Sequence, residues 1–400
     1  MSKVMAVNAG SSSLKFKLFQ MPEEEVLTDG VVERIGMDDA IFTIRVNGEK
    51  ISHVEPIKDH QQAVDMLLKA LVDYKIVKQL DEIDAVGHRV LHGGEKYADS
   101  AVVTPEVAQD ILDMKDLGPL HMPANYIGYK AFATALPNVK HVTVYDTAFH
   151  LTMKPETFLY PIPLEYYEKY KARRYGFHGT SHKYVSEYFA KLEGKTPEEV
   201  NVITCHLGNG ASLAAVQGGK CINTSMGFTP LAGIMMGARS GDIDPSLMEY
   251  LMEKTGLSAK EMINTLNKKS GLLGISGVSS DARDVDKAFK EGNPRAILAR
   301  KMYAQRVAAY IGSYFVQLGH VDGIVFTAGL GENDPDVRAE ICDLLTEALG
   351  VHIDKELNST VRGKIAKIST PESKIAVWVI PTNEELVIAR DTCRLLHLDQ

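Results

Sequence analysis

The sequence is poor in cysteine and tryptophan and has no long apolar run. Its 400 residues include four cysteines and one tryptophan. The cysteines are widely separated and form no C-x-x-C pair, so neither a disulfide framework nor a cysteine zinc site is expected. No segment approaches the roughly 20 apolar residues of a membrane span, and the first residues lack the apolar core of a signal peptide. We therefore expect a cytoplasmic protein with no membrane partner.

Basic residues are outnumbered by acidic ones. The chain has 44 Lys and Arg against 52 Asp and Glu, which gives a net charge of −8. A protein with this balance lacks the broad basic surface typical of nucleic-acid binding, so we expect no nucleic-acid partner. An anionic ligand would have to be bound by arginines and lysines that gather locally.

One pattern occurs twice along the chain. Residues 4–8 and 14–19 read as two strands that flank a Gly/Ser turn, and residues 200–205 and 212–216 repeat this arrangement around Gly208 and Gly210. Asn8-Ala9-Gly10-Ser11 can be placed over His206-Leu207-Gly208-Asn209 without a gap. The repeat predicts two similar α/β domains, each presenting a turn between strands to a shared cleft. We place the first domain at 1–150 and the second at 151–383, with the last helix, 384–400, returning to the first.

Local signals predict several helices. Asp59 is expected to cap a helix that runs to about Tyr74, and Thr104-Pro105 to begin one that ends at Gly118. A long helix is expected over 293–318. Thr382-x-x-Glu385 has the form of a capping box and predicts that the last helix begins at Thr382.

Small polar loops follow three of the predicted strands. They are residues 8–13, Gly208-Asn209-Gly210 and Gly329-Leu330-Gly331. Backbone N–H groups in such loops can bind phosphate, although each loop taken singly is better explained as a tight turn between two strands. None matches the Walker A pattern, and neither glycine pair completes G-x-G-x-x-G, so a P-loop NTPase and a Rossmann dehydrogenase are disfavoured.

Arginine, histidine and acidic side chains also stand in irregular, glycine-rich segments. Arg89 and Arg239 are flanked by glycines, which suits an arginine that binds carboxylate or phosphate better than one on a regular helix face. His178 and His182 are four apart, but the glycine after His178 argues against a helical zinc motif. A hydrogen bond from a histidine to a phosphoryl oxygen is the better interpretation. Asp146 follows a predicted strand.

At these residues the chain resembles the acetokinase family over nearly its full length. The segments that carry the resemblance are VMAVNAGSSSLK, GHRVLHGGE, YDTAFH, RRYGFHGTSH, HLGNGAS, GARSGDIDP, TAGLGEN and IPTNEE. The resemblance implies the duplicated actin/hexokinase/Hsp70-like (ribonuclease H-like) α/β fold, with a nucleotide cleft between two domains, and a homodimer. It also implies reversible, Mg²⁺-dependent phosphoryl transfer between ATP and acetate, giving acetyl phosphate and ADP, with Mn²⁺ as a substitute metal.

The resemblance further implies roles for individual residues. The catalytic residues would be Asp146, His178 and Arg239. The substrate-binding residues would be Arg89, Leu91, His121, Phe177 and Pro230, with Leu120 nearby. The metal ligands would be Asn8 and Glu384. The nucleotide would be bound by Ser11, Ser13, Lys15, His206, Leu207, Gly208, Asn209, Gly210, Asp281, Ala282, Arg283, Gly329, Leu330, Gly331, Glu332 and Asn333.

Three other functions remain open at this stage. A propionate or butyrate kinase of the same family would share these residues, and Leu91 stands where many relatives have valine. A sugar or glycerol kinase of the same fold would use Asp146 as a base. A non-catalytic ATPase would need neither Arg89 nor Arg239 in a pocket. A carboxylic acid with a pKa near 4.3 is already ionised at neutral pH, so an acid-accepting kinase needs no general base. Asp146 is then expected to orient an arginine or a metal-bound water.

Overall fold

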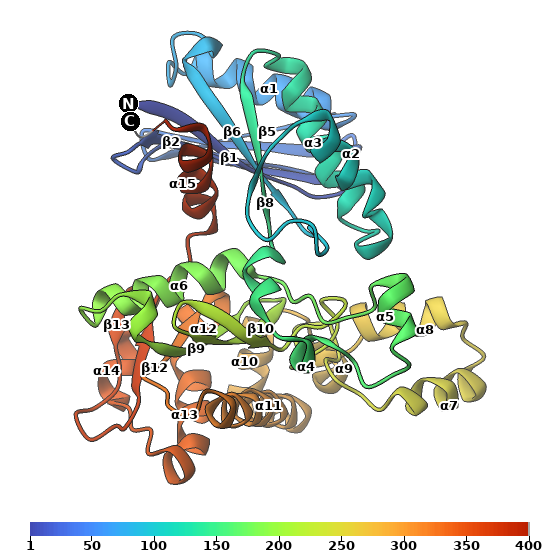
Figure 1. Cartoon of the computed structure of the whole chain (residues 1–400), viewed down its shortest axis with the longest axis vertical. Helices are drawn as coiled ribbons and strands as arrows, with labels where there is room; N and C mark the ends of the chain where they lie inside the picture. The colour runs from blue at the N-terminus through green and yellow to red at the C-terminus, as the bar shows by residue number, and fades with distance from the viewer. Residues whose placement is uncertain (399–400) are drawn as a thin grey trace. The chain divides into compact units, whose positions relative to one another are not determined.

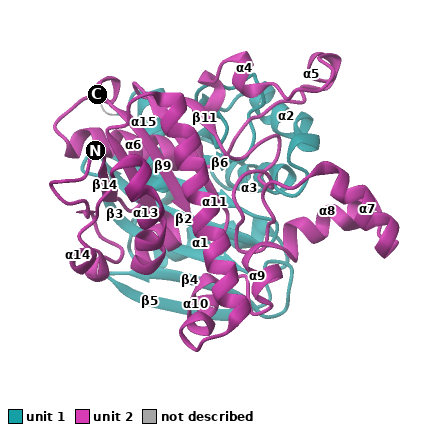
Figure 2. Cartoon of the chain, turned by 90° about the horizontal axis from the view of Figure 1, so that it is seen from below, with its two compact units in different colours: residues 1–148, 383–400 teal, residues 149–382 magenta. Residues whose placement is uncertain are grey.

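The chain folds into two compact units in the computed structural model, which describes residues 1–398 (Figures 1 and 2). Unit 1 comprises Met1–Ala148 and the C-terminal segment from Asn383, and unit 2 comprises Phe149–Thr382. The chain therefore passes between the units twice, after Ala148 and after Thr382. The last two residues of the helix predicted over 384–400 lie outside the described residues.

Unit 1 is built on an eight-stranded sheet with the strand order β5-β4-β3-β2-β1-β6-β8-β7. Its strands are β1 (Ser2–Ala9), β2 (Ser13–Met21), β3 (Glu25–Glu33), β4 (Ala40–Val46), β5 (Glu49–Glu55), β6 (Ile83–Val90), β7 (Ala101–Val102) and β8 (Lys140–Tyr145). Its helices are α1 (His60–Asp73), α2 (Pro105–Asp113), α3 (Met122–Ala135) and α15 (Glu384–Leu396), with short 3-10 turns η1 (Leu80–Glu82), η2 (Lys115–Leu117) and, at its end, the start of η3 (Ala148–Thr152).

Unit 2 is built on a six-stranded sheet with the order β11-β10-β9-β12-β14-β13. Its strands are β9 (Asn201–Leu207), β10 (Ala211–Gln217), β11 (Lys220–Thr224), β12 (Gly323–Thr327), β13 (Ala366–Lys367) and β14 (Ala376–Val379). Its helices are α4 (Pro155–Phe158), α5 (Glu165–Tyr170), α6 (Gly179–Leu192), α7 (Pro245–Thr255), α8 (Ala259–Lys268), α9 (Gly271–Ser276), α10 (Ala282–Lys290), α11 (Pro294–Leu318), α12 (Ala328–Asn333), α13 (Pro335–Leu349) and α14 (Lys355–Thr360), with the 3-10 turn η4 (Pro197–Glu199).

The two sheets share one topology. In unit 1, β1 pairs with β2 antiparallel and with β6 parallel, and β6 pairs with β8 parallel. In unit 2, β9 pairs with β10 antiparallel and with β12 parallel, and β12 pairs with β14 parallel. A short antiparallel strand borders each sheet, β7 beside β8 and β13 beside β14. The duplication predicted from the sequence is therefore present in the sheets.

The two equivalent turns differ in length. Ala9 pairs with Leu14 across the first turn, which leaves residues 10–13 as its loop. Leu207 pairs with Ala211 across the second, which leaves only residues 208–210. The ungapped match of the two segments therefore holds along the strands and fails within the turn, where the second copy is one residue shorter.

Each repeat ends in a helix that packs on the sheet of the other repeat. Helix α6 follows the first repeat and packs on β9 and β12, whereas α15 follows the second repeat and packs on β1, β6 and β8. A glycine permits each close approach. A Cβ on Gly87 would lie 2.5 Å from Ile388 of α15, and a Cβ on Gly323 would lie 2.2 Å from Phe189 of α6.

Most predicted helix ends are confirmed, and two are wrong. Asp59 caps α1 by accepting a hydrogen bond from the Gln62 N–H, and the long helix is α11. The helix that begins after Thr104 ends at Asp113, and the 3-10 turn η2 rather than the helix extends to Gly118.

The start of the last helix also differs from the prediction. Asn383, not Thr382, is the N-cap of α15, because its side chain accepts the Leu386 N–H. Thr382 instead donates its backbone N–H to Glu332 at 3.0 Å, and its hydroxyl contacts that of Ser181 at 2.8 Å. The predicted capping box is therefore absent.

Candidate active site

Three polar side chains meet at the carboxyl ends of neighbouring strands in unit 1. Asn8 lies near the end of β1, Arg89 near the end of β6, and Asp146 directly after β8. Arg89 donates Nε to Asp146 Oδ1 at 2.9 Å and Nη2 to Asp146 Oδ2 at 2.6 Å, and its Nη1 lies 3.3 Å from Asn8 Oδ1. The Asp146 side chain is 0% exposed, and each of its two oxygens accepts a hydrogen bond from the Arg89 guanidinium.

The arginine in this cluster stays charged. Burial alone lowers the pKa of Arg89, but the Asp146 carboxylate raises it, and the charge of Glu384 adds to the effect, with a net shift above the ordinary value. Glu384 lies in the first turn of α15 and is half-buried. Arg89 is therefore close to both predicted metal ligands, Asn8 and Glu384.

A buried amide on α3 connects two loops of this cluster. The side chain of Asn125 is 5% exposed, accepts the Leu91 N–H at 3.0 Å and donates to the Ala9 carbonyl at 2.9 Å. The registered pairing of β1 and β6 ends at Val7 and His88, so beyond that point Asn125 bridges the diverging strand ends. Gly128 lets α3 approach, because a Cβ there would lie 2.3 Å from that of Ala9.

The serine-rich turn after β1 is fixed by two hydrogen bonds of Gly10. The Gly10 N–H donates to the Ser13 carbonyl at 2.8 Å, and the Gly10 carbonyl contacts Nε2 of buried His60 at 2.8 Å. Ser11 and Lys15 are exposed, and Lys15 stands opposite Asn8 in the β1–β2 register. The side chains of Ser11 and Lys15 are therefore accessible to a ligand.

In unit 2, a histidine and an arginine approach the same glycine. A Cβ built on Gly210 would lie 3.1 Å from Arg239 Nη1 and 3.6 Å from His178 Nε2. Arg239 Nη1 also lies 3.9 Å from the Met236 sulfur, and no ion pair joins Arg239 to an acid among residues 1–398. Burial lowers the pKa of Arg239 from its ordinary value. Its charge is thus available to an anion, in contrast to that of Arg89.

His178 stands at the N-terminus of α6 in a left-handed backbone conformation, with φ 56°. Its ring stacks on that of His206, with centroids 4.1 Å apart. Its Nδ1 lies 2.9 Å from the Ser212 hydroxyl, which directs Nε2 toward the side where Arg239 lies. Since non-glycine residues seldom adopt this φ, the conformation is maintained by the surrounding contacts.

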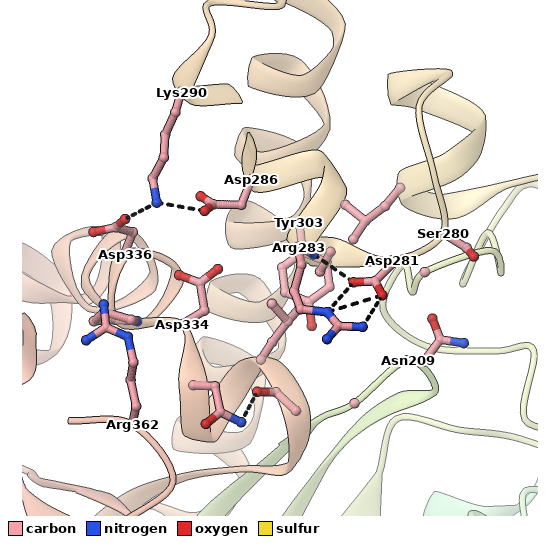
Figure 3. A pocket seen from close by; sticks show the side chains of 18 residues that line it. Asn209, Ser280, Asp281, Arg283, Asp286, Lys290, Tyr303, Asp334, Asp336 and Arg362 are labelled. Atoms are coloured by element: carbon pink, nitrogen blue, oxygen red, sulfur yellow. Dashed lines mark hydrogen bonds and ion pairs between the residues drawn. The ribbon is translucent and has the colours of Figure 1, made fainter. Parts of the chain in front are cut away.

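Unit 2 also contains a pocket of about 680 Å³ (Figure 3). Its wall comes from the β9–β10 turn, from α10, and from α12 with the start of α13. Asp281 caps α10 and pairs with Arg283, whose guanidinium lowers the pKa of Asp281 to about 2. The volume and the glycine-rich wall suit a nucleotide. The lining residues are Gly208, Asn209, Gly237, Leu272, Ser280, Asp281, Ala282, Arg283, Asp286, Lys290, Tyr303, Gly329, Leu330, Asn333, Asp334, Pro335, Asp336 and Arg362.

A profile of the acetokinase family matches residues 3–390. The chain is 58% identical over 398 residues to the acetate kinase of Geobacillus sp. (strain WCH70), covering 100% of both chains. It is also 58% identical to that of Bacillus subtilis (strain 168), covering 99% of this chain and 100% of the relative.

The chain belongs to the acetokinase family.

Solved structures of acetokinases share the fold. The crystal structure of Porphyromonas gingivalis acetate kinase superposes with a TM-score of 0.94 at 45% identity, covering 99% of this chain and 100% of that one. A propionate kinase from Francisella tularensis superposes with a TM-score of 0.93 at 40% identity, covering 98% and 100%. The predicted fold class, the duplicated actin/hexokinase/Hsp70-like α/β fold, is confirmed.

Eight of the residues predicted to bind nucleotide in this acetokinase line the unit 2 pocket. They are Gly208, Asn209, Asp281, Ala282, Arg283, Gly329, Leu330 and Asn333. His206, Leu207, Gly210, Gly331 and Glu332 do not line it. The predicted loop at Gly329-Leu330-Gly331 lies in the short helix α12, where Glu332 folds back to accept the Ala328 N–H at 2.8 Å. This hydrogen bond stabilises Ala328, whose φ is 63°.

The residues predicted to form the acyl pocket are divided between the units. Leu91 is buried and His121 is the N-cap residue of α3, both in unit 1, where neighbouring Leu120 is 70% exposed. In unit 2, Phe177 is buried, and its carbonyl contacts His150 Nε2 at 2.7 Å. Pro230, in the loop after β11, is half-buried.

Several residues around the site were not predicted from the sequence. Asn125 lies in an ordinary helical pattern. The partners of its two hydrogen bonds, Leu91 and Ala9, are distant in the sequence, so no local motif indicates its role. Lys290, Asp336 and Arg362 line the pocket from segments outside the three predicted loops. Arg338 is completely buried and donates to the carbonyls of Gly331, Asn358 and Val361, which fixes α12 against the segment that precedes Arg362.

Proposed function

We propose that this acetokinase catalyses reversible phosphoryl transfer between ATP and acetate, giving acetyl phosphate and ADP. The observation that carries the proposal is the 58% identity to acetate kinases over the full length of both chains. The nucleotide-sized pocket in unit 2 and the arginines of the two units give this assignment a chemical basis.

The chemistry requires charge neutralisation more than a base. An acetate oxygen attacks the γ-phosphorus while the bond from that phosphorus to the β–γ bridging oxygen breaks and ADP leaves with the electron pair. Because acetate is already ionised, no proton has to be removed, and the barrier arises largely from repulsion between anions. Arg239, a cation without an acidic partner among residues 1–398, would bind the transferring group or the carboxylate.

Arg89 and Asp146 act together as an ion pair in this proposal. The two hydrogen bonds from Arg89 to Asp146 orient the guanidinium, and the remaining nitrogen, Nη1, faces Asn8. Asp146 then orients the arginine instead of accepting a proton. This arrangement favours a carboxylate acceptor over the alcohol of a sugar, for which a catalytic base is required.

The predicted Mg²⁺ site fits the donors that the chain provides. Asn8 supplies an amide oxygen and Glu384 a carboxylate, and Mg²⁺ usually binds one or two carboxylates together with substrate phosphates and waters. Both donors lie close to Arg89 by the contacts described above. When bound, Mg²⁺ would neutralise phosphate charge, and Mn²⁺ is expected to replace it.

His178 would stabilise charge on the equatorial oxygens of the transferring phosphoryl group. Its Nε2 and the guanidinium of Arg239 converge beside Gly210, which has no side chain to separate them. Groups preorganised in this way act where charge develops, without reorganisation during the reaction.

A propionate kinase activity is the second candidate. The Francisella tularensis propionate kinase is 40% identical and has nearly the same fold. Leu91 and Gly118 are in close contact, since a Cβ on Gly118 would lie 2.9 Å from Leu91 Cδ2. A tightly packed leucine at this position favours a short acyl chain, and therefore acetate.

We also propose a cytoplasmic homodimer that uses α7 in its interface. This 11-residue helix contains Leu247, Met248, Tyr250, Leu251 and Met252, yet none of its residues is buried within the chain. Helix α7 contacts α8 but none of its apolar residues is buried there, and an apolar helix surface that stays exposed in this way is typical of a subunit interface. None of the helices in the described part of the chain is long and apolar enough to cross a membrane.

A hydroxamate trap for acyl phosphate tests the proposed activity. Purified protein with Mg²⁺ and ATP should form hydroxamate with acetate, less with propionate, little with butyrate and none with glycerol. Product with propionate exceeding that with acetate would support the second candidate. ATP consumption that no acid increases would refute both.

A further inference from the structure

We propose that Thr204, His182 and Ser212 form a hydrogen-bonded chain that holds His178 as the neutral tautomer with its proton on Nε2. The inference rests on the proposed function of His178 as a hydrogen-bond donor to the transferring phosphoryl group. The three residues would be positioning residues, because none of them has a predicted contact with substrate.

The chain of contacts is continuous and buried. Thr204 Oγ1 lies 2.6 Å from His182 Nδ1, His182 Nε2 lies 2.8 Å from Ser212 Oγ, and Ser212 Oγ lies 2.9 Å from His178 Nδ1. Thr204, His182 and Ser212 are each 0% exposed. Buried polar groups are nearly always hydrogen-bonded, so at such burial we take the protons to be shared within the chain of contacts.

The Ser212 hydroxyl couples the tautomers of the two histidines. It has one proton and contacts two imidazole nitrogens, so it can donate to only one and must accept from the other. If His182 Nε2 carries a proton, Ser212 donates to His178 Nδ1, and the proton of neutral His178 is on Nε2. In the opposite arrangement neutral His178 has its proton on Nδ1 and cannot donate from Nε2.

Thr204 selects between these two arrangements. In the first, the Thr204 hydroxyl donates to His182 Nδ1 over 2.6 Å, and every proton in the chain is donated over a short contact. In the second, the Thr204 proton can reach only the Ala214 carbonyl at 3.5 Å, at the limit of a hydrogen bond. Burial, with the nearby rings of His150 and His206, lowers the pKa of His182, so its ring is neutral as the first arrangement requires.

The ring of His178 is also fixed in space by groups on three elements. Ser212 on β10 binds its Nδ1, His206 on β9 stacks on its face, and α6 begins at its backbone. Orientation and tautomer are therefore set together, before substrate binds, which is the condition for efficient electrostatic stabilisation of a transition state.

Nitrogen NMR of the full-length protein labelled at histidine tests the tautomer directly, with His178 assigned by the loss of its signals in His178→Gln. We expect the ring of His178 to be protonated at Nε2 and bare at Nδ1 near pH 7. Ser212→Ala should move its signals toward a mixture of tautomers. Thr204→Val should shift them in the same direction, and Thr204→Ser should restore them. Thr224→Val is the matched control, because it removes a buried hydroxyl of the same sheet that donates outside the chain, to the Leu213 carbonyl.

Kinetics supply the second readout. Ser212→Ala should lower kcat by at least about tenfold. The loss should not exceed the 10²–10³-fold decrease typical of removing the hydrogen-bond donor itself. KM for acetate and ATP and the thermal midpoint should stay near their original values. A proton on Nδ1 of His178 in the unmodified protein, or equal spectra for Thr204→Val and Thr224→Val, would overturn the inference. Full activity in Ser212→Ala would also overturn the inference and would leave the proposed function intact. An unmodified protein that forms no acyl phosphate would instead refute the proposed function.

Discussion

Acidification should destabilise unit 1 through a buried histidine pair. His88 Nε2 and His141 Nδ1 are 2.9 Å apart between β6 and β8, and both rings are almost completely buried. Burial lowers the pKa of His141 to about 4, and burial with the neighbouring ring lowers the pKa of His88. The rings of Tyr129 and Phe132 pack against the pair and carry no charge to stabilise an imidazolium. A backbone hydrogen bond with Leu136 opposes the lowering of the His141 pKa only in part.

The sign and size of the effect follow from proton binding. An unfolded chain binds a proton at His141 with a pKa of about 6.5, whereas the folded chain does so only near 4. The unfolded state therefore takes up more protons as the pH falls below about 6.5, and stability decreases until the pH reaches the folded value. Between pH 7 and pH 5 His141 alone should remove about 2 kcal/mol from the free energy of unfolding, at 1.36 kcal/mol per pKa unit.

Urea unfolding of His141→Gln and the unmodified protein at pH 7, 6 and 5 isolates this contribution. Titrating groups other than His88, which contacts His141, are common to both proteins and largely cancel in the difference. We expect the substitution to cost stability at pH 7, where it disrupts a packed site, and that cost to shrink by about 2 kcal/mol at pH 5. A difference in unfolding free energy that stays constant from pH 7 to pH 5 would show that His141 titrates normally in the folded chain, and would refute the reasoning.

Three further predictions concern the site itself. Arg239→Ala should lower kcat at least 10²-fold without loss of fold, since it removes a charge-stabilising donor; near-normal turnover would contradict the proposed mechanism. Gly210→Ala should lower kcat about tenfold, by analogy with the cost of disturbing one such donor, while leaving the melting temperature almost unchanged. The reason is that the new methyl group would lie 3.1 Å from Arg239 Nη1. Steady-state kinetics would measure the lowered kcat, and calorimetry would measure the unchanged melting temperature. Asn125→Leu should destabilise unit 1 by roughly 2–4 kcal/mol, because it leaves two buried backbone groups unpaired, and should raise KM for acetate. An unchanged unfolding midpoint would show that water replaces the amide.

The repeat and the helix caps were predictable because their causes are local. Strand alternation and the caps Asp59 and Thr104 each act within a few residues, and the structure contains all of them. The helical form of residues 328–333 was missed because it depends on Glu332 reaching back to the Ala328 N–H, in a sequence whose glycines suggest a loop.

The polar contacts of the site could not be predicted in the same way. Arg89 and Asp146 are 57 residues apart, and only the parallel pairing of β6 with β8 brings them together. The role of Asn125 depends on where two strand ends diverge, 116 residues from the carbonyl that it binds. The resemblance indicated which residues matter, but their partners follow from the packing of the chain.

The exchange of terminal helices determines the order in which the chain can fold during synthesis. Helix α15 buries Val387, Ile388, Ala389 and Cys393 against the sheet of unit 1, and it is synthesised after the whole of unit 2. Unit 2 is contiguous from Phe149 to Thr382 and already includes α6. Unit 2 can therefore fold first, while the sheet of unit 1 keeps one face uncovered until α15 has been synthesised. In a chain truncated before Asn383, unit 2 should accordingly resist proteolysis, whereas the first 148 residues should be cleaved.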